Sequence, residues 1–225
     1  MKSHTIIAKP FIEKADRIEK SLDSLINKRL SEKSLQHIEE IEKKYLQIQI
    51  QSIPIFKAAT GQEFPHPNLF FFVFLYQELS AVFNEAQQLI SNLPEISQIE
   101  KEFEGMKDFL DNRMTLAYIG DAALEICVIP YIWQQSPEKL PSSEFLHKER
   151  GRLVENSPLS QYWDGLSLFD PTILKQHPDE NAETKGSYLE AVFGIIYLEH
   201  GVNAVEIALQ NLLRYNEKTR QSFIN

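Results

Sequence analysis

The segments LAYIGDAALE (residues 116–125) and YLEAVFGIIYL (residues 188–198) decide the fold of this chain. Both have the apolar composition of core-forming helices, and each contains a carboxylate, Asp121 in the first and Glu190 in the second. Carboxylates are seldom fully buried without a partner, because removing an isolated charge from water costs several kcal/mol. Two such acids in core-forming helices indicate that both side chains share one cation.

The composition is that of a folded protein with an acidic surface. The chain has 225 residues, of which 43% are hydrophobic. This is enough for one domain with an added subdomain or for two small domains. The formal net charge is −9. Because affinity for nucleic acid rests largely on contacts from Lys and Arg to phosphate, this charge argues against a general nucleic-acid binder. It does not argue against a nuclease that uses a metal ion.

The sequence gives no indication of export or of a membrane span. Residues 1–20 lack a continuous apolar stretch, so no secretory signal is expected. The longest strongly apolar run, residues 69–75, is far shorter than the roughly 20 residues that cross a bilayer. The single cysteine, Cys127, excludes a disulfide framework within the chain. We therefore expect a soluble, cytoplasmic protein that has no membrane partner.

The N-terminal region predicts a helical hairpin. Residues 10–28 place apolar side chains at spacings of three and four, which is typical of an amphipathic helix. Residues 35–46 show the same pattern after a start signal at Ser31. The dipeptide Ile53-Pro54 then breaks the helical pattern. A charge-rich hairpin of this kind usually serves in docking or dimerisation.

The remaining sequence predicts an all-α fold. Strand-like alternation occurs around residues 47–51, and this stretch also continues a helical stripe. We assign residues 1–55 to an N-terminal helical extension and residues 56–225 to the main domain. Pro130 is expected to bend or shorten its helix. The further helices are expected over residues 67–90, 95–111, 112–135, 143–165 with a split near Pro158, 185–200 and 202–215, with an exposed acidic loop over 170–183.

The surroundings of the two acids suit a magnesium ion, but they also have simpler interpretations. On a helix, Ala117 and Met114 lie on the face of Asp121. Ser187 lies one turn before Glu190. Magnesium prefers oxygen ligands, often needs one or two carboxylates, and can activate water for attack on a phosphodiester. Alternatively, an Asp that follows a Gly is commonly a helix cap, and a single Glu is commonly solvated at the edge of an apolar stripe.

The order of the motifs resembles that of the ribonuclease III endonuclease domain. The order is Tyr-Ile-Gly-Asp-Ala-x-Leu-Glu at residues 118–125, Leu-Val at 153–154, Leu-Glu-Ala-x-x-Gly-x-x-Tyr-Leu at 189–198, and then Gly201. The resemblance covers about residues 112–215. It is closest to the compact Mini-III branch, which lacks a double-stranded-RNA-binding domain. The expected fold is therefore a ribonuclease III-like helical domain with an N-terminal extension.

This resemblance implies that Asp121 and Glu190 are the catalytic acids and bind Mg²⁺, with Mn²⁺ as a substitute. The larger ribonuclease III enzymes have further acids at the positions of Met114, Ala117 and Ser187. The Mini-III pattern has apolar or small residues at these positions, as this chain does. The resemblance therefore adds Ser187 to the expected metal site, where its hydroxyl could bind a metal-coordinated water.

The resemblance also implies double-stranded RNA as a partner and a symmetric homodimer as the assembly. Four cations are candidates for contacts to RNA phosphates. Lys148 and Arg152 can lie on one side of a helix, and Arg113 and Lys185 are close to the two motifs. The same side chains could instead form a solvated charged face or pair with the acids.

Three functions remain open at this point. The first is a metal-dependent endoribonuclease that cleaves double-stranded or structured RNA, with ribosomal RNA precursors as the expected substrate class. The second is a non-catalytic scaffold of ribonuclease III fold that associates with RNA or ribosomes. The third is a helical adaptor in which residues 1–50 bind a partner helix.

Overall fold

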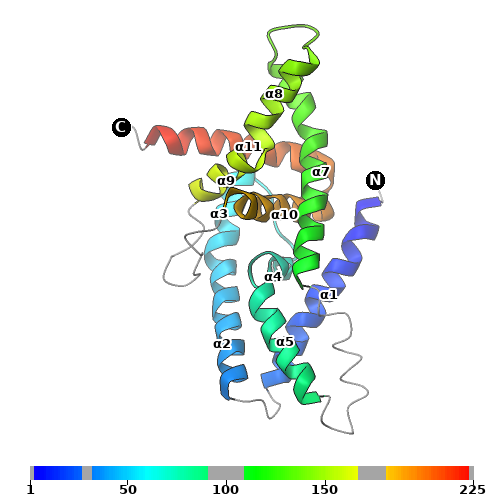
Figure 1. The fold of residues 1–225 in the computed structure, drawn as a ribbon, viewed down its shortest axis with the longest axis vertical. Coiled ribbons are helices and arrows are strands. Elements are labelled where there is room, and N and C mark those ends of the chain that lie inside the picture. The colour runs from blue at the N-terminus through cyan, green and yellow to red at the C-terminus, as the bar shows by residue number, and fades with distance from the viewer. Residues whose placement is uncertain (1–2, 27–31, 91–108, 167–180, 223–225) are drawn as a thin grey trace.

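The computed structural model describes residues 3–26, 32–90, 109–166 and 181–222, and helices dominate all four ranges (Figure 1). No strand occurs within these ranges, which confirms the prediction of an all-α fold. Most of the helix expected over 95–111 and most of the loop expected over 170–183 lie outside the described residues.

The N-terminal region forms a nearly continuous helical path after its first helix. Helix α1 spans Ser3–Ile26 and α2 spans Glu32–Gln47. A π-helical turn, η1 (Ile48–Ser52), joins α2 directly to α3 (Ile53–Thr60). The predicted break at Ile53-Pro54 is therefore wrong.

The π turn explains why Pro54 does not end the helix. A proline inside an α-helix lacks an N–H and its ring clashes with the carbonyl four residues earlier. Here the backbone N–H of Ile53 bonds to the carbonyl of Ile48, which widens the turn just before the proline. Pro54 then lies within the first two residues of α3, a position that a helix tolerates.

The two long N-terminal helices pack on different parts of the molecule. Helix α2 packs against α5 (Tyr76–Ile90), whereas α1 packs against α10 (Ala182–His200) and the short helix η2 (Pro67–Leu69). Direct contacts between α1 and α2 are few, so the predicted hairpin is splayed. The assignment of residues 1–55 to a separate extension stays a prediction. Buried side chains of this region, such as Ile18 and Ile41, belong to the same apolar cluster as the rest.

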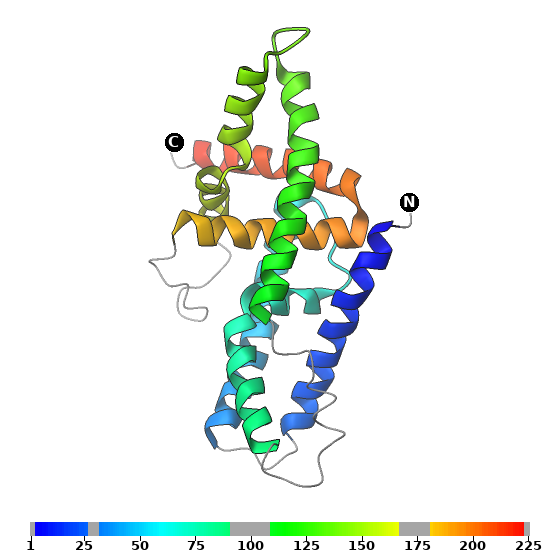
Figure 2. The same cartoon turned by 45° about the vertical axis from the view of Figure 1, so that its right-hand side comes forward.

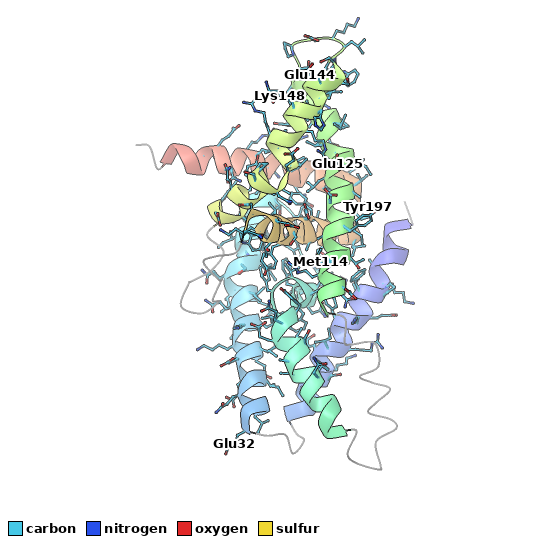
Figure 3. All side chains as sticks on the ribbon, viewed as in Figure 1. Glu32, Met114, Glu125, Glu144, Lys148 and Tyr197 are labelled. Carbon is cyan, nitrogen blue, oxygen red and sulfur yellow. The ribbon has the colours of Figure 1, made fainter. Side chains whose placement is uncertain are left out.

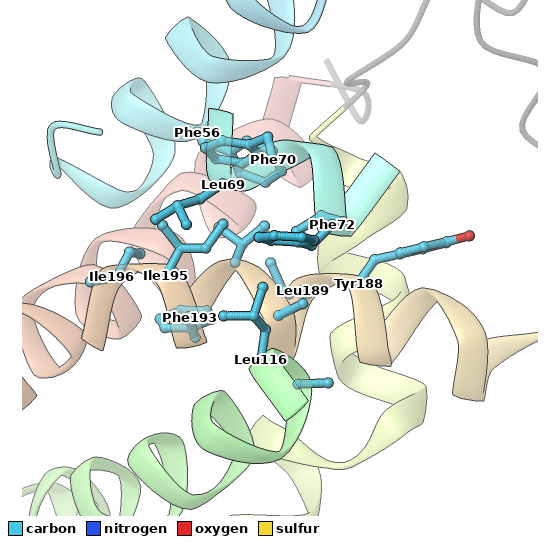
Figure 4. Packing of buried hydrophobic residues seen from close by; sticks show 14 of the residues in the cluster. Phe56, Leu69, Phe70, Phe72, Leu116, Tyr188, Leu189, Phe193, Ile195 and Ile196 are labelled. Atoms are coloured by element: carbon cyan, nitrogen blue, oxygen red, sulfur yellow. The ribbon is translucent and has the colours of Figure 1, made fainter. Parts of the chain in front are cut away.

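The apolar segment after Pro67 is divided into short pieces. We expected one helix to Ile90, but η2 is followed by α4 (Phe70–Phe74), and the path changes at Leu75 before α5 begins. The aromatic side chains explain this division, because they fill the centre of the molecule (Figure 4). The ring of Phe70 stacks on Phe56 at 5.7 Å and on Phe74 at 5.8 Å between centroids.

The C-terminal half contains five described helices. Helix α7 continues through Pro130 to Gln135, where the predicted helix also ends, so of the two expected effects of this proline the shortening does not occur and the bend stays a prediction. The split between α8 and α9 lies at Glu155, three residues before Pro158, because Pro158 occupies the first turn of α9. Gly201 ends α10 with a φ of 82°, as predicted from its position. The helices are α7 (Phe109–Gln135), α8 (Ser143–Val154), α9 (Asn156–Gly165), α10 (Ala182–His200) and α11 (Val202–Ser222).

Helix α7 is apolar on two faces. One face, which includes Leu116 and Val128, is buried in the core. The other exposes Tyr118 and Ile126, with 76% and 62% of their surfaces accessible. By length and composition alone, residues 111–135 could cross a membrane, although 44% of the apolar window is buried inside the protein. A core helix of this composition passes the same test.

Candidate active site

The two acids come together because α7 and α10 cross in close contact (Figure 2). A Cβ atom on Gly120 would overlap the backbone carbonyl of Glu190, and one on Gly194 would overlap the backbone carbonyl of Leu116. Only glycine permits such a close approach of two helix backbones. Because Asp121 follows Gly120 directly, this crossing places its carboxylate beside that of Glu190.

Asp121 and Glu190 line one pocket of about 660 Å³. The pocket lies between α7, α8, the start of α9 and the first half of α10. One of its lining residues, Met114 of α7, is labelled in Figure 3. Its other lining residues are Arg113, Met114, Ala117, Tyr118, Arg150, Val154, Glu155, Asn156, Ser157, Glu183, Thr184 and Ser187. The three positions that carry additional acids in the larger ribonuclease III enzymes therefore all lie in this pocket.

Both acids hold a proton more tightly than usual. Burial, together with the nearby charge of Asp121, raises the pKa of Glu190 to about 7. Burial and the charge of Glu125 raise the pKa of Asp121, while Arg150 acts in the opposite direction. A cation between the two carboxylates would relieve their repulsion and favour the charged form of each. The pair therefore has the electrostatic character of a cation site.

The Ser187 hydroxyl lies in the pocket but already has two partners. It donates to the carbonyl of Thr184 at 2.9 Å and accepts from Nη1 of Arg113 at 3.0 Å. One lone pair of its oxygen is left for a further contact, close to the positive charge of Arg113. Its role as a metal ligand stays a prediction.

The four cations proposed for RNA binding occupy different surroundings. Arg113 lines the pocket, whereas the other three lie outside its lining. Lys148 is exposed on α8, and Arg152 pairs with Glu149 at 2.9 Å. Lys185 pairs with Asp164 at 2.9 Å.

Sequence reasoning missed the charged pocket residues Arg150 and Glu155. Arg150 of α8 forms a two-pronged ion pair with Glu125 of α7 and faces Asp121 from there. This pairing links positions 25 residues apart, and the basic group in α8 gave no means of choosing Arg150 over its neighbours. Glu183 was expected in a loop, but it lies in the first turn of α10. The side chain of Asn181, which accepts from the Thr184 N–H at 2.9 Å, caps this turn.

The donor set fits a magnesium-like ion better than a transition metal. Carboxylate and hydroxyl oxygens are the ligands that Mg²⁺ prefers, and it needs few of them from the protein. Within the described residues, no group of three or more His, Cys, Asp or Glu side chains could hold a metal ion. Asp121 and Glu190 would therefore hold such an ion with water or substrate oxygens completing its coordination.

The helical fold and the paired acids agree with the resemblance to the ribonuclease III endonuclease domain, and sequence comparisons support it. Residues 114–201 match the family described as Ribonuclease III domain. Ribonuclease 3 of Chloroflexus aggregans is 24% identical over 149 residues, which are 64% of this chain and 57% of that protein. This chain thus spans little more than half the length of that relative. No solved structure matches the chain.

The resemblance to the ribonuclease III family is thereby confirmed, and the matched segment contains both motifs of the sequence analysis. It extends from α7 to the cap of α10 and so includes Asp121, Glu190 and the glycine crossing. These matches do not distinguish the Mini-III branch from the rest of the family. That finer assignment stays a prediction.

Proposed function

We propose that this protein is an endoribonuclease that hydrolyses phosphodiester bonds of double-stranded or structured RNA with the help of a divalent cation. The observation that carries the proposal is the meeting of Asp121 and Glu190 in one pocket of a ribonuclease III domain. Mg²⁺ is the proposed cation, with Mn²⁺ as a substitute. Ribosomal RNA precursors are the proposed substrate class, and the cytoplasm is the proposed location.

In this mechanism the chain supplies the two carboxylates that bind the cation and the helix crossing that positions them. The glycine crossing holds the backbones of α7 and α10 together, so Asp121 and Glu190 stay on neighbouring turns of the two helices. When bound, a divalent cation supplies an activated water and neutralises charge on the phosphate. The ion pair between Arg150 and Glu125 keeps α8 against α7 and so maintains one wall of the pocket. The expected products carry 5′-phosphate ends.

RNA recognition must overcome the net negative charge of the chain. We propose that Lys148 and Arg152 on α8, with Lys185 and Arg113 nearer the acids, contact RNA phosphates. A-form RNA is recognised mainly by its shape and by its phosphate and 2′-hydroxyl groups, so no reading of bases is required. The ion pairs of Arg152 and Lys185 are partly exposed, and phosphate oxygens can replace their carboxylate partners.

The exposed apolar face of α7 supports the proposed homodimer. This face carries Tyr118, Ile126 and Trp133, all exposed, on the helix that also provides Asp121. Large exposed apolar patches usually mark interaction sites. A twofold dimer through this face would place two pockets on one assembly, as a duplex substrate requires.

A second candidate is a non-catalytic scaffold of the same fold. Among the described residues no group of three or more His, Cys, Asp or Glu side chains is placed to hold a metal ion, which favours this alternative. A scaffold would bind RNA or ribosomes without needing a cation at Asp121.

The decisive experiment is a cleavage assay on long duplex RNA with Mg²⁺ or Mn²⁺. Cleavage by the wild-type chain and its loss in Asp121→Asn, with folding and assembly unchanged, is the expected result. Circular dichroism and analytical ultracentrifugation provide the controls. Full metal-dependent activity in Asp121→Asn contradicts the mechanism. Binding of the duplex without cleavage in either metal, together with no metal-induced change at Asp121, supports the scaffold instead.

A further inference from the structure

Arg113 is an almost completely buried arginine in the wall of the candidate active site. Only 7% of its surface is accessible, yet it is among the residues that line the pocket. An arginine stays charged at any ordinary pH, and a buried charge is costly unless other groups compensate for it. The groups around Arg113 therefore indicate what its charge is for.

The neighbours of Arg113 hold the guanidinium in place without neutralising it. Its Cζ atom lies 4.8 Å from the ring centre of Tyr76 and 4.9 Å from that of Tyr188. Nη1 donates to Ser187 at 3.0 Å, and Nη2 contacts the sulfur of Met114 at 3.5 Å. The buried Nε has no hydrogen-bond partner among the residues that the structure describes. Within the described part of the chain, no carboxylate forms an ion pair with Arg113.

Arg150, the second arginine of the pocket, provides a contrast. It is paired with Glu125, and its charge also lowers the pKa of Asp121. Arg113 is not among the groups that shift the pKa of Asp121 or of Glu190. The charge of Arg150 is therefore compensated within the protein, whereas Arg113 has no ionic partner among the described residues and lies in the wall of the same pocket.

A pocket that contains a fixed, uncompensated guanidinium is suited to an anion. We propose that Arg113, positioned by Ser187, binds the RNA phosphate that the acid pair cleaves. This inference rests on the proposed function and assigns Arg113 a role different from that of the surface cations. The N–H groups of Arg113 that do not bond to Ser187 would contact non-bridging phosphate oxygens, where charge develops during hydrolysis. The aromatic contacts keep the group oriented before the substrate arrives.

The first test compares arginine variants in duplex cleavage. Arg113→Met is expected to lower kcat by about a hundredfold, because it removes a preorganised donor from the reacting phosphate. Arg113→Lys should lose less activity than Arg113→Met, since lysine keeps the positive charge but lacks the planar guanidinium group. Ser187→Ala keeps the guanidinium and removes one contact, so a loss of about tenfold is expected. Arg214→Met, at an exposed arginine of α11 outside the pocket, is the matched control and should cleave as the wild type does.

The kinetic pattern separates this role from a structural one. A phosphate ligand at the reacting centre predicts a fall in kcat with an intact circular dichroism spectrum and an intact melting transition. Wild-type kcat in Arg113→Met overturns the inference. So does an equal fall in Arg113→Met and Arg214→Met. In either case the proposed function stands as long as the wild-type chain cleaves RNA.

A second test does not depend on cleavage. Inorganic phosphate added to the wild-type protein should shift the Arg113 Nε–H resonance in the nuclear magnetic resonance spectrum, and Ser187→Ala should weaken this response. A shift without any cleavage activity would leave the anion site standing while the proposed function fails. An Arg113 resonance unchanged by phosphate, in a protein that cleaves RNA, overturns the inference alone.

Discussion

Helix α10 carries a partly buried glutamate near its middle, Glu190, and another at its C-terminal end, Glu199, and comparing their surroundings shows what distinguishes a candidate site. Burial raises the pKa of both Glu190 and Glu199 to about 7. Glu190 faces a second acid across the pocket between α7 and α8. Glu199, whose side chain is 1% exposed, accepts the backbone N–H of His66 at 2.9 Å. Among the groups that shift its pKa there is no second carboxylate.

The comparison teaches that a perturbed pKa alone does not identify a catalytic acid. Glu199 fastens the C-terminal end of α10 to the loop before η2, and His200 adds a contact of 2.7 Å to the carbonyl of Glu63. One oxygen of Glu199 therefore has a backbone partner, while its Oε2 is buried without a hydrogen-bond partner among the described residues. At Glu190 a second acid on the crossing helix faces the carboxyl group, and a cation between the two would relieve their repulsion. The same raised pKa thus accompanies a structural contact at the C-terminal end of α10 and a candidate catalytic pair near its middle.

The largest expected difference between the two glutamates is in catalysis. Glu190→Gln should lower duplex cleavage by about a thousandfold or more, because it removes half of the acid pair. Glu199→Gln has nearly the same shape and charge change, but it should retain wild-type kcat. Single-turnover cleavage with saturating Mg²⁺ measures both. Equal losses in the two variants would show that burial, and not the pairing with Asp121, decides the activity.

The next effect concerns the close crossing of α7 and α10, which distinguishes the surroundings of Glu190 from those of Glu199. Gly120→Ala should destabilise the fold by about 3 kcal/mol, because the added methyl group overlaps the backbone of α10. Any folded fraction should cleave poorly, since α7 and α10 must separate and carry the acids with them. Urea unfolding gives the change in free energy. Ala122→Ser, on the exposed side of the same turn, is the matched control, and a stability loss as large as that of Gly120→Ala would argue against the close crossing.

The smallest expected effect is on the pH dependence of stability. A folded-state pKa of about 7, against an ordinary value of 4.5, means that the folded protein holds a proton that the unfolded chain has lost. Stability should therefore fall as the pH rises from about 4.5 to about 7. With Mg²⁺ bound, Glu190 is held ionised and the remaining fall reports Glu199. Glu199→Gln should reduce this fall by on the order of 1 kcal/mol. Melting curves that are unchanged by this substitution would contradict the prediction.

The pairing of Asp121 with Glu190 could be predicted because each motif contains a carboxylate within an apolar helical segment. An acid in an apolar helix is informative without knowledge of its neighbours, and the glycine beside Asp121 marks a close contact. The role of Arg150 could not be predicted, because it depends on Glu125 in another helix. The role of Glu199 could not be predicted either, because in the sequence this residue resembles an ordinary solvated glutamate near the end of a helix.

The helix boundaries were predictable where apolar periodicity was strong, and the prediction failed at Pro54. Pro54 lies within a continuous helical path, whereas the split near Pro158 and the end of the helix that contains Pro130 agree with the prediction. The expectation that proline ends a helix uses only the local sequence, whereas a helix in a packed core can change its hydrogen bonding to accommodate the proline. The interruption at Leu75 had no local signal, because it follows from how the phenylalanine rings share the core.

The π turn at Ile48–Ser52 holds one residue more than an α-helical turn. A single-residue deletion within it would return the path to α-helical spacing and leave α2 in nearly the same orientation relative to α3. Ile38 and Ile41 would then stay in the core. A single-residue deletion within α2, after these two residues, would instead rotate them by about 100° away from the core.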